Sequence, residues 1–330
     1  MDVPDMAAAY LTELGPPEVI RFGRLPVPVP GPTDVLVRVE AVAVNPVDTF
    51  VRSGAYRTPT PFPFVVGRDM VGSVVAVGTG TTGLTTGTRV WANSLGHGGR
   101  QGCSAEYAVV AADRSYPLPD GADPVPAVAG LHPAATAHLG LFHHAGLRSG
   151  ETVYLGGGAG NVGTVATVLA AEAGARVVVS ARPADTERCR AAGAHTVLDY
   201  RDTELSARIR QAAPDGIDVW WDTSGHHDLE LAVPLLARRG RIVLAAGLTT
   251  RPSLPVGAVY TRDARLAGFA ISNADTAELA DAACAVNRLL AADRLPVRVA
   301  DVLPLSAAAA AHRRLEDPHV RLPGRLVLRP

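Results

Sequence analysis

A glycine-rich segment, Gly158-Ala159-Gly160-Asn161-Val162-Gly163, stands between a short apolar run and a long alanine-rich one. In a strand–turn–helix unit, the first glycine of such a pattern permits a tight turn and the second lets a pyrophosphate approach the backbone. The third lets the helix pack on the strand, and the helix N-terminus favours negative phosphates. A glycine turn without a ligand is the alternative, but the flanking runs favour a dinucleotide site. Its expected members are Gly158, Gly160, Asn161, Val162 and Gly163.

The next apolar run ends in Ser180-Ala181-Arg182, where no acidic residue stands. An acid at this point would bond the ribose 2′-hydroxyl of NAD, whereas an arginine can form a forked contact with a 2′-phosphate. Two unit charges about 4 Å apart interact by roughly 4 kcal/mol at a surface-like dielectric, so the sign of the charge matters. Ser180 can donate a further hydrogen bond. We therefore expect NADPH as the cofactor; the alternative is that Arg182 is a solvent-exposed loop residue.

Strand-like and helix-like segments alternate from about residue 123 onward. Because such alternation builds a parallel doubly wound sheet, it predicts an α/β fold with a Rossmann dinucleotide-binding domain over 123–272. Residues 1–122 have β-branched runs separated by Gly, Pro and Thr, which predicts a β-rich domain. The expected strands of the parallel sheet are 151–157, 175–181, 195–200, 217–224, 240–247 and 264–272, and the helices expected between them include one over 228–240.

The composition excludes several classes of protein. The net charge is −1 and no long basic run occurs, so no nucleic-acid partner is expected. The N-terminus lacks a basic start with an apolar core, and no apolar run reaches the length of a membrane span, so we expect a cytoplasmic protein without a membrane segment. The 3 cysteines match neither a disulfide framework nor a zinc-ligand spacing. The chain has no lysine, which rules out Schiff-base catalysis.

Several segments resemble a known family. The medium-chain dehydrogenase/reductases have similar segments in the same order, and the likeness is greatest to their zinc-free quinone oxidoreductase branch, which includes zeta-crystallin-like proteins. This resemblance implies a chaperonin-10-like catalytic domain formed by 1–122 together with 273–330. It also implies a homodimer. The segments are AVAVNPVDTFVRSGAY, PFVVGRDMVGSVVAVG, GETVYLGGGAGNVG, AAGAHTVLDYRD and LLARRGRIVLAAG.

The resemblance also has implications for metal and substrate. Zinc-dependent relatives have a cysteine where this chain has Asn45, and Gly-His-Glu where it has Gly67-Arg68-Asp69. Because a catalytic zinc needs about three Cys, His or carboxylate ligands, and an arginine would repel the cation, no metal is expected. Without a Lewis acid, the expected small-molecule substrate is a quinone or an enone, which delocalises the arriving negative charge itself.

Individual site residues follow from the resemblance. Asn45 resembles a hydrogen-bond donor near the nicotinamide, Tyr56 is a candidate proton donor, and Thr136 resembles a threonine that contacts the nicotinamide ribose. Removing a donor to a developing oxyanion should cost more than removing a late proton donor, so we expect Asn45→Ala to lower kcat more than Tyr56→Phe. Tyr200 resembles a residue near the adenosine 2′-phosphate, and the further cofactor-binding candidates are Gly247 and Phe269.

Two alternatives stay open. One is an enoyl reductase that acts on a single intermediate of polyketide-like secondary metabolism. The other is an NADPH-binding protein without turnover. Acceptor profiling separates an enoyl reductase from a quinone reductase, and acceptor-dependent NADPH consumption separates an enzyme from a binding protein.

Overall fold

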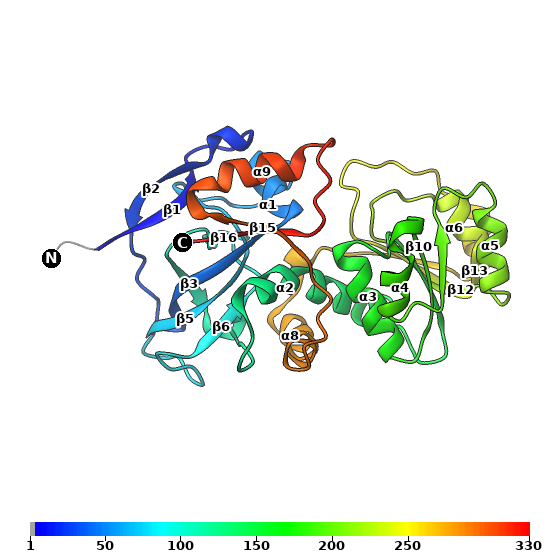
Figure 1. The fold of residues 1–330 in the computed structure, drawn as a ribbon, viewed down its shortest axis with the longest axis horizontal. Coiled ribbons are helices and arrows are strands. Elements are labelled where there is room, and N and C mark those ends of the chain that lie inside the picture. Colours follow the sequence, from blue (N-terminus) through cyan, green and yellow to red (C-terminus); the bar gives the residue numbers. More distant parts are fainter. Residues whose placement is uncertain (1–3) are drawn as a thin grey trace. The chain divides into compact units, whose positions relative to one another are not determined.

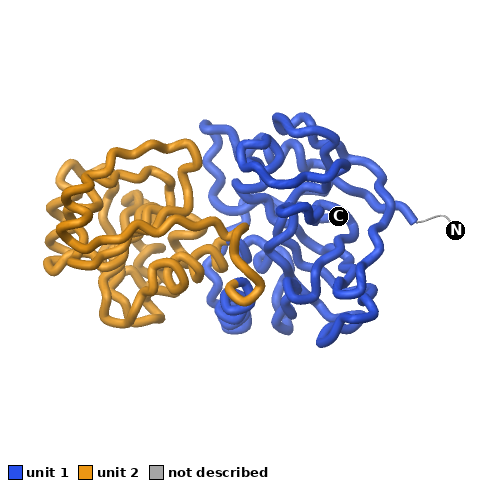
Figure 2. Tube along the Cα trace, turned by 180° about the vertical axis from the view of Figure 1, so that it is seen from behind, with its two compact units in different colours: residues 1–132, 279–330 blue, residues 133–278 orange. Residues whose placement is uncertain are grey.

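The computed structural model describes residues 4–330, and the chain divides into two compact units (Figure 2). One unit is formed by the chain up to His132 and from Leu279 onward, and the other by Pro133–Glu278. The boundaries fall inside α2 (Pro124–His138) and α8 (Thr276–Ala291), because each helix runs on across its boundary. They therefore lie several residues later than the predicted boundaries after 122 and 272. Within residues 4–330, no helix combines the length and apolarity that a membrane crossing requires.

The unit formed by Pro133–Glu278 contains a parallel sheet with helices on both faces. Its strand order is β11-β10-β9-β12-β13-β14, and neighbouring strands run parallel. In Figure 1, α3 and α4 lie on one side of this sheet and α5 and α6 on the other. This confirms the predicted doubly wound α/β fold. The strands are β9 (Thr152–Gly156), β10 (Arg176–Ala181), β11 (Thr196–Asp199), β12 (Ile217–Asp222), β13 (Leu236–Leu244) and β14 (Arg265–Gly268), and the helices are α3 (Asn161–Glu172), α4 (Thr186–Ala191), α5 (Leu205–Ala212), α6 (Leu229–Leu235) and α7 (Val256–Tyr260).

The helix predicted over 228–240 ends early. α6 stops at Leu235, and Leu236 already pairs with Ile217 of β12 as the first residue of β13. Arg239 adopts a left-handed φ of 66°, which a continuing helix does not allow. The prediction was therefore wrong for the last turn and a half of this segment.

The glycine turn joins β9 to α3. Gly157, which directly precedes Gly158, has a left-handed φ of 68°. α3 begins at Asn161, with Gly160 as its N-cap residue. A Cβ atom on residue 163 would lie 2.3 Å from the carbonyl oxygen of Gly157. The helix can therefore approach the strand this closely only where residue 163 is glycine.

The other unit is β-rich and includes the C-terminal segment of the chain. Its larger sheet has the order β15-β16-β3-β5-β6-β8, with β7 also paired to β3, and a smaller sheet has the order β2-β1-β4. In β3, Val35, Val37 and Val39 alternate into the core, as the period of a strand requires. The strands are β1 (Asp5–Leu11), β2 (Arg21–Pro26), β3 (Asp34–Val44), β4 (Phe64–Val65), β5 (Asp69–Val77), β6 (Arg89–Ala92), β7 (Tyr107–Ala111), β8 (Tyr116–Pro117), β15 (Val299–Pro304) and β16 (Arg325–Arg329), and the helices are α1 (Pro46–Ser53) and α9 (Ala308–Glu316).

An ion pair between a buried arginine and a partly exposed glutamate joins α1 and α9 of this unit. Arg52 on α1 is 2% exposed, and its guanidinium donates to both carboxylate oxygens of Glu316 at the end of α9, at 2.9 and 2.7 Å. Its Nε atom also donates to the carbonyl oxygen of Gly15 at 3.0 Å. A forked arginine–carboxylate contact of this kind fixes orientation as well as distance. It holds the C-terminal segment against the element that begins at Asn45.

We expect Gly163→Ala to lower the free energy of unfolding by about 1–3 kcal/mol, because a methyl group would overlap the backbone of Gly157. Urea unfolding, followed by the fluorescence of the tryptophans, measures the change. Gly257→Ala is the matched control: a Cβ atom there meets nothing within 4 Å and the residue lies in α7. If both variants were as stable as the parent protein, the close approach would not constrain this position.

Candidate functional site

The start of α3 has the features of a phosphate-binding turn. The first N–H groups of an α-helix have no partner within the helix, and the N-cap residue Gly160 has no side chain to supply one. The positive end of the helix dipole adds to this preference for an anion. A Cβ atom on Gly158 would lie 2.6 Å from Cβ of Val179 in β10, so this glycine is needed for strand packing. These features fit the pyrophosphate of a dinucleotide.

The end of β10 differs from the sequence-based expectation. Ser180 is 3% exposed, and its Oγ accepts a hydrogen bond from the Tyr154 hydroxyl at 2.9 Å, so its side chain points into the unit. Arg182 donates through Nε to Asp185 Oδ2 at 2.9 Å, and its Nη2 lies 2.8 Å from the same oxygen. The strand itself ends without an acid, as expected, and the nearest acid in the chain is Asp185 in the turn that follows. Asp185 ends the short turn η4 (Pro183–Asp185), which follows β10.

Asp185 could have been found in the sequence. In dinucleotide folds, the acid that bonds the ribose follows the glycine motif by about 20 positions, and Asp185 stands at about that distance after Gly163. The pairing with Arg182 depends on the turn that the chain makes after the strand.

Tyr200 lies beside this strand end. β11 pairs with β10 through Ala181 and Asp199, so Arg182 and Tyr200 are the next residues on two neighbouring strands. The Tyr200 side chain is exposed, and the guanidinium of Arg201 lies 5.8 Å from its ring centroid. The two residues predicted to be near a 2′-phosphate therefore leave the sheet at the same edge.

Three further cofactor candidates lie in this unit. Gly247 follows β13 with a φ of 74°, and the Phe269 N–H donates to the carbonyl oxygen of Leu244 at 3.0 Å. The Phe269 ring stacks on His144 with centroids 4.4 Å apart. Thr136 on α2 is 7% exposed, and among residues 4–330 its Oγ1 has no hydrogen-bond partner. A buried hydroxyl without a partner is costly, and a polar group of a bound ligand would satisfy it.

In the β-rich unit, Asn45 is fully buried. Its Nδ2 donates to Asp69 Oδ2 at 2.9 Å, and its backbone N–H donates to Asp48 Oδ2 at 2.8 Å, which caps the start of α1. The side chain is engaged in the interior and does not present a donor at the surface. The structure therefore does not support direct donation from Asn45 to a substrate.

Asn45 belongs to a buried cluster with two acids and two arginines. Burial, with added repulsion from Asp48, raises the pKa of Asp69 to about 8, and burial raises the pKa of Asp48 to about 6. Arg68 is 2% exposed and acts in the opposite direction on both carboxyls. Arg325 is also buried, and this burial lowers its pKa. The cluster thus brings two carboxyl groups and two guanidinium groups together in the interior of the unit.

Tyr56 follows α1 and is half-buried. Its ring stacks on His97 with centroids 5.6 Å apart and planes 14° from parallel. Burial and the positive charge of Arg68 lower the pKa of His97 to about 4, so this imidazole is neutral at pH 7. Of the two candidates in the β-rich unit, Tyr56 is thus the one whose side chain reaches the surface.

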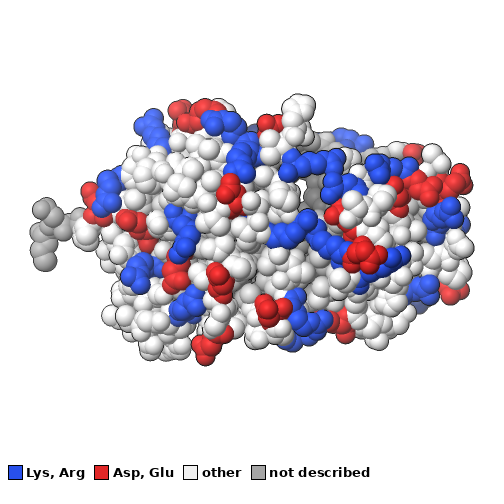
Figure 3. Space-filling model, in the orientation of Figure 1, with Lys and Arg blue, Asp and Glu red and all other residues white. Residues whose placement is uncertain are grey.

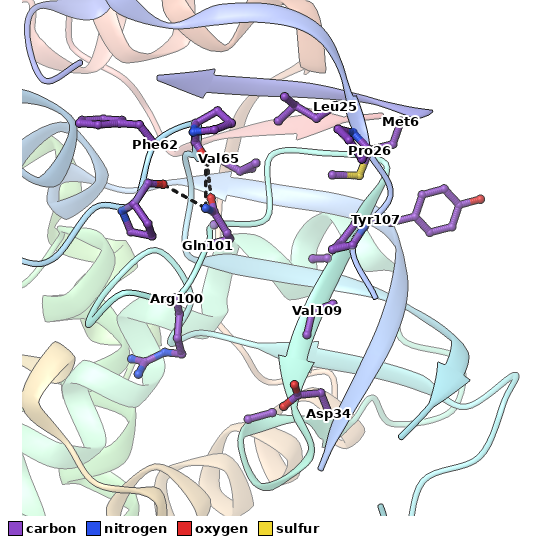
Figure 4. A pocket seen from close by; sticks show the side chains of 16 residues that line it. Met6, Leu25, Pro26, Asp34, Phe62, Val65, Arg100, Gln101, Tyr107 and Val109 are labelled. Atoms are coloured by element: carbon purple, nitrogen blue, oxygen red, sulfur yellow. Dashed lines mark hydrogen bonds between the residues drawn. The ribbon is translucent and has the colours of Figure 1, made fainter. Parts of the chain in front are cut away.

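A separate pocket of about 470 Å³ lies in the same unit (Figure 4). Gln101 supports one wall: its Oε1 accepts from the Val65 N–H at 2.7 Å, and its Nε2 donates to the carbonyl oxygen of Pro63 at 3.0 Å. Neither Asn45 nor Tyr56 lines the pocket. It is therefore distinct from the predicted site residues of this unit.

Both halves of the chain match family models. Residues 31–120 match the alcohol dehydrogenase GroES-like domain, and residues 161–285 match the zinc-binding dehydrogenase model. A quinone oxidoreductase of Sus scrofa is 31% identical over 93% of this chain and 93% of its own length. The chain belongs to the medium-chain dehydrogenase/reductase family. The match with the pig protein places it in the quinone oxidoreductase branch, as the sequence segments predicted.

Two other proteins are similar to most of this chain. A mycobacterial structure complexed with NADPH is 29% identical, with a TM-score of 0.83, and the match covers 98% of this chain and 100% of that one. A phthioceranic/hydroxyphthioceranic acid synthase of Mycobacterium bovis is 31% identical over 90% of this chain, which corresponds to 14% of the synthase.

The buried Asp69 makes stability depend on pH. Its pKa is higher in the folded protein than the ordinary value of 3.8, so the folded state holds the proton more tightly. The stabilisation is complete below pH 4 and is lost as the pH rises towards 8. The Asp69→Asn side chain cannot ionise, so we expect its free energy of unfolding to rise relative to that of the parent protein between pH 5 and pH 8.5. The expected gain is at least about 1 kcal/mol, which is less than the free energy that corresponds to one pKa unit.

Urea unfolding of Asp69→Asn and of the parent protein between pH 5 and pH 8.5 measures the two free energies of unfolding. Asp301→Asn is the control, since Asp301 is an exposed acid whose hydrogen bond with Arg314 lowers its pKa. It should show no such gain at alkaline pH. A stability difference between Asp69→Asn and the parent that is constant with pH would contradict the assignment.

Proposed function

We propose that this protein is an NADPH-dependent reductase that transfers hydride to a quinone or another conjugated carbonyl compound without zinc. The glycine turn carries the proposal, because it lies at the carboxyl end of β9, where dinucleotides bind in this fold. Arg182 and Tyr200 directly follow two neighbouring strands at the same end of the sheet, which supports binding of the 2′-phosphate of NADPH there. The NADPH complex of a relative and the quinone oxidoreductase relatives support the cofactor and the reaction class.

Some of the site residues would hold the cofactor, and another would complete the reaction. NADPH, when bound, supplies the hydride. The N-terminus of α3 would hold its pyrophosphate, and the Thr136 hydroxyl would take one of its polar groups. Tyr56 carries a phenol that can return a proton to the reduced acceptor. Positioning is expected to dominate, because a conjugated acceptor carries the incoming charge itself.

A zinc-free reaction is supported by the cluster around Asn45. A catalytic zinc requires about three Cys, His or carboxylate ligands. Here Asn45 Nδ2 donates to Asp69, and the buried Arg68 places a positive charge beside the same carboxyl. A divalent cation would have to displace the amide and overcome the repulsion of the guanidinium.

The test is the rate of NADPH oxidation with a panel of quinones, enones and enoyl thioesters. We expect consumption only when an acceptor is present, with NADPH preferred to NADH by about tenfold, which corresponds to about 1.4 kcal/mol. We expect activity to survive incubation with EDTA. Metal analysis of the protein follows this incubation. Loss of activity on chelation, with recovery on added zinc, would refute the zinc-free proposal.

An enoyl reductase is the second candidate, and the match with the phthioceranic/hydroxyphthioceranic acid synthase favours it. The same panel decides between the two, because an enoyl reductase should prefer thioesters to quinones by a wide margin. A protein that binds NADPH but consumes none with any acceptor would be a binding protein.

We expect Tyr56→Phe to lower kcat by about tenfold or more, since general-acid groups contribute factors of this order and above, with little change in stability. Asn45→Ala should instead lower stability, because Asn45 donates to Asp69 in the interior. The measurements are kcat and the midpoint of urea unfolding for each variant. Tyr107→Phe is the control, because Tyr107 lines the separate pocket. An unchanged kcat in Tyr56→Phe would remove the phenol from the mechanism.

We also propose a homodimer, joined through β14. This strand is at the edge of the parallel sheet, and one long side of it has no neighbouring strand among the residues described. Exposed apolar side chains, Val256 and Tyr260, lie just before it on α7. An edge strand with apolar neighbours is suited to pairing with a second copy.

A further inference from the structure

The loop after β6 carries an arginine with spare hydrogen-bonding capacity. Arg100 donates through Nε to the carbonyl oxygen of Ser94 at 3.1 Å, and its backbone N–H donates to the carbonyl oxygen of His97 at 3.2 Å. Among residues 4–330, neither of its Nη atoms makes a hydrogen bond or an ion pair. A guanidinium binds a carboxylate through two parallel N–H groups, so Arg100 retains donors that an anion can use.

A second arginine, Arg114, stands beside the same loop. β6 pairs antiparallel with β8, with Trp91 opposite Tyr116. Continuing this register by two residues brings Arg114 opposite Asn93, the residue before Ser94. Arg114 ends the short turn η2 (Ala112–Arg114), and in the described part of the chain its guanidinium has no hydrogen bond or ion pair.

Other arginines of the β-rich unit have acidic partners. Figure 3 shows blue arginines interspersed with red acids over the visible face of this unit. Three such pairs, at 3.6, 3.3 and 2.6 Å, are Arg24–Glu106, Arg89–Glu40 and Arg313–Glu18. Next to Arg114 in the chain, Asp113 is exposed and forms no ion pair among the residues described. Arg100, Arg114 and Asp113 together therefore carry one net positive charge.

The positive charges act on one another and on the imidazole in this loop. Burial, with added repulsion from Arg114 and Arg68, lowers the pKa of Arg100, and Asp113 acts in the opposite direction. Arg100 and Arg114 also contribute to the low pKa of His97. An anion close to these guanidinium groups would offset their mutual repulsion.

The loop also joins these arginines to Tyr56. The ring of His97 stacks on that of Tyr56, and the carbonyl oxygen of His97 accepts from the Arg100 N–H. Ser94, which binds the Arg100 Nε atom, is 7% exposed, and its own hydroxyl has no hydrogen-bond partner within residues 4–330. A hydroxyl buried in this way can donate to a bound anion. An acceptor held at the Tyr56 phenol would thus have positive charge and free donors near one side.

We propose that Arg100 and Arg114 bind an anionic substituent of the acceptor, so that the preferred substrate is a quinone or an enone that carries a carboxylate. The inference rests on the proposed function, because it names the class of acceptor for the same reaction. The conjugated part of such a molecule accepts the hydride, and its carboxylate fixes the orientation. Neither arginine takes part in the transfer of hydride or proton.

The test compares two acceptors that differ only in charge, a 1,4-naphthoquinone with a propionate side chain and the methyl ester of the same compound. Two methylene groups separate the carboxylate from the ring, so the ring accepts hydride equally well in both. At saturating NADPH, the parent protein should have a KM for the acid about tenfold below its KM for the ester. Raising the salt concentration to about 1 M should remove most of this difference, because salt screens the attraction.

Three substitutions test the two arginines. Arg114→Gln and Arg100→Gln should each raise the KM for the acid by about threefold or more and change the KM for the ester by less than about twofold. Arg114→Gln removes no hydrogen bond, so it remains informative if Arg100→Gln disturbs the contact with Ser94. Asp113→Asn should lower the KM for the acid, because it removes an opposing charge.

Arg21→Gln is the matched control. Arg21 is exposed on β2, in the smaller sheet, and its substitution makes the same change in net charge. It should leave the ratio of the two KM values unchanged. The midpoint of urea unfolding of each variant shows whether the fold is retained.

Two outcomes would overturn the inference alone. One is a parent protein that reduces acceptors but has no lower KM for the acid than for the ester. The other is a preference for the acid that Arg114→Gln and Arg100→Gln both leave intact. A parent protein that consumes NADPH with neither compound, nor with any acceptor of the panel described above, would overturn the proposed function as well, so the two failures are distinguishable.

Discussion

The close approach of α3 to the end of β9 is the constraint on which the nucleotide-binding unit depends. It exists because residue 163 has no side chain to meet the carbonyl oxygen of Gly157. The next residue, Thr164, then reaches the carbonyl oxygen of Gly160 and accepts a hydrogen bond from Arg188. In the turn before α3, the Gly158 N–H donates to the carbonyl oxygen of Ser180 near the end of β10 at 3.0 Å. One missing methyl group thus sets the positions of the helix dipole and of the arginine bound to the turn.

The β-rich unit is organised by a different kind of constraint. Burying Asp48, Asp69, Arg68 and Arg325 together has a large desolvation cost, which good geometry and opposite charges offset only in part. Asn45 helps to satisfy both acids, one through its side chain and one through its backbone. Such clusters add little net stability but favour one arrangement over others, because removing any member leaves a buried charge without its counterpart.

The sequence predicted what depends on local pattern. Alternating segments indicated the parallel sheet, and the glycine spacing located the turn between β9 and α3. It did not predict that Asp185 folds back on Arg182, because this contact depends on the turn after β10. It also did not predict the end of α6, since Leu236 prefers pairing with β12 to a further helical turn. Nor did residue type reveal the burial of Asn45: an asparagine that caps a helix is usually at the surface.

The pairing of β16 with β3 has a consequence for synthesis on the ribosome. Val42 and Val44 pair with Leu328 and Leu326 of β16. The side of β3 that pairs with β16 therefore has no partner strand at these residues until the C-terminal segment has been made. The nucleotide-binding unit is contiguous in the chain and can finish folding earlier. The β-rich unit must wait, with a hydrophobic strand edge open to other nascent chains. The strand that leads directly into Asn45 is therefore completed last, and cellular yield should be more sensitive to truncation at the C-terminus than to changes in many exposed loops.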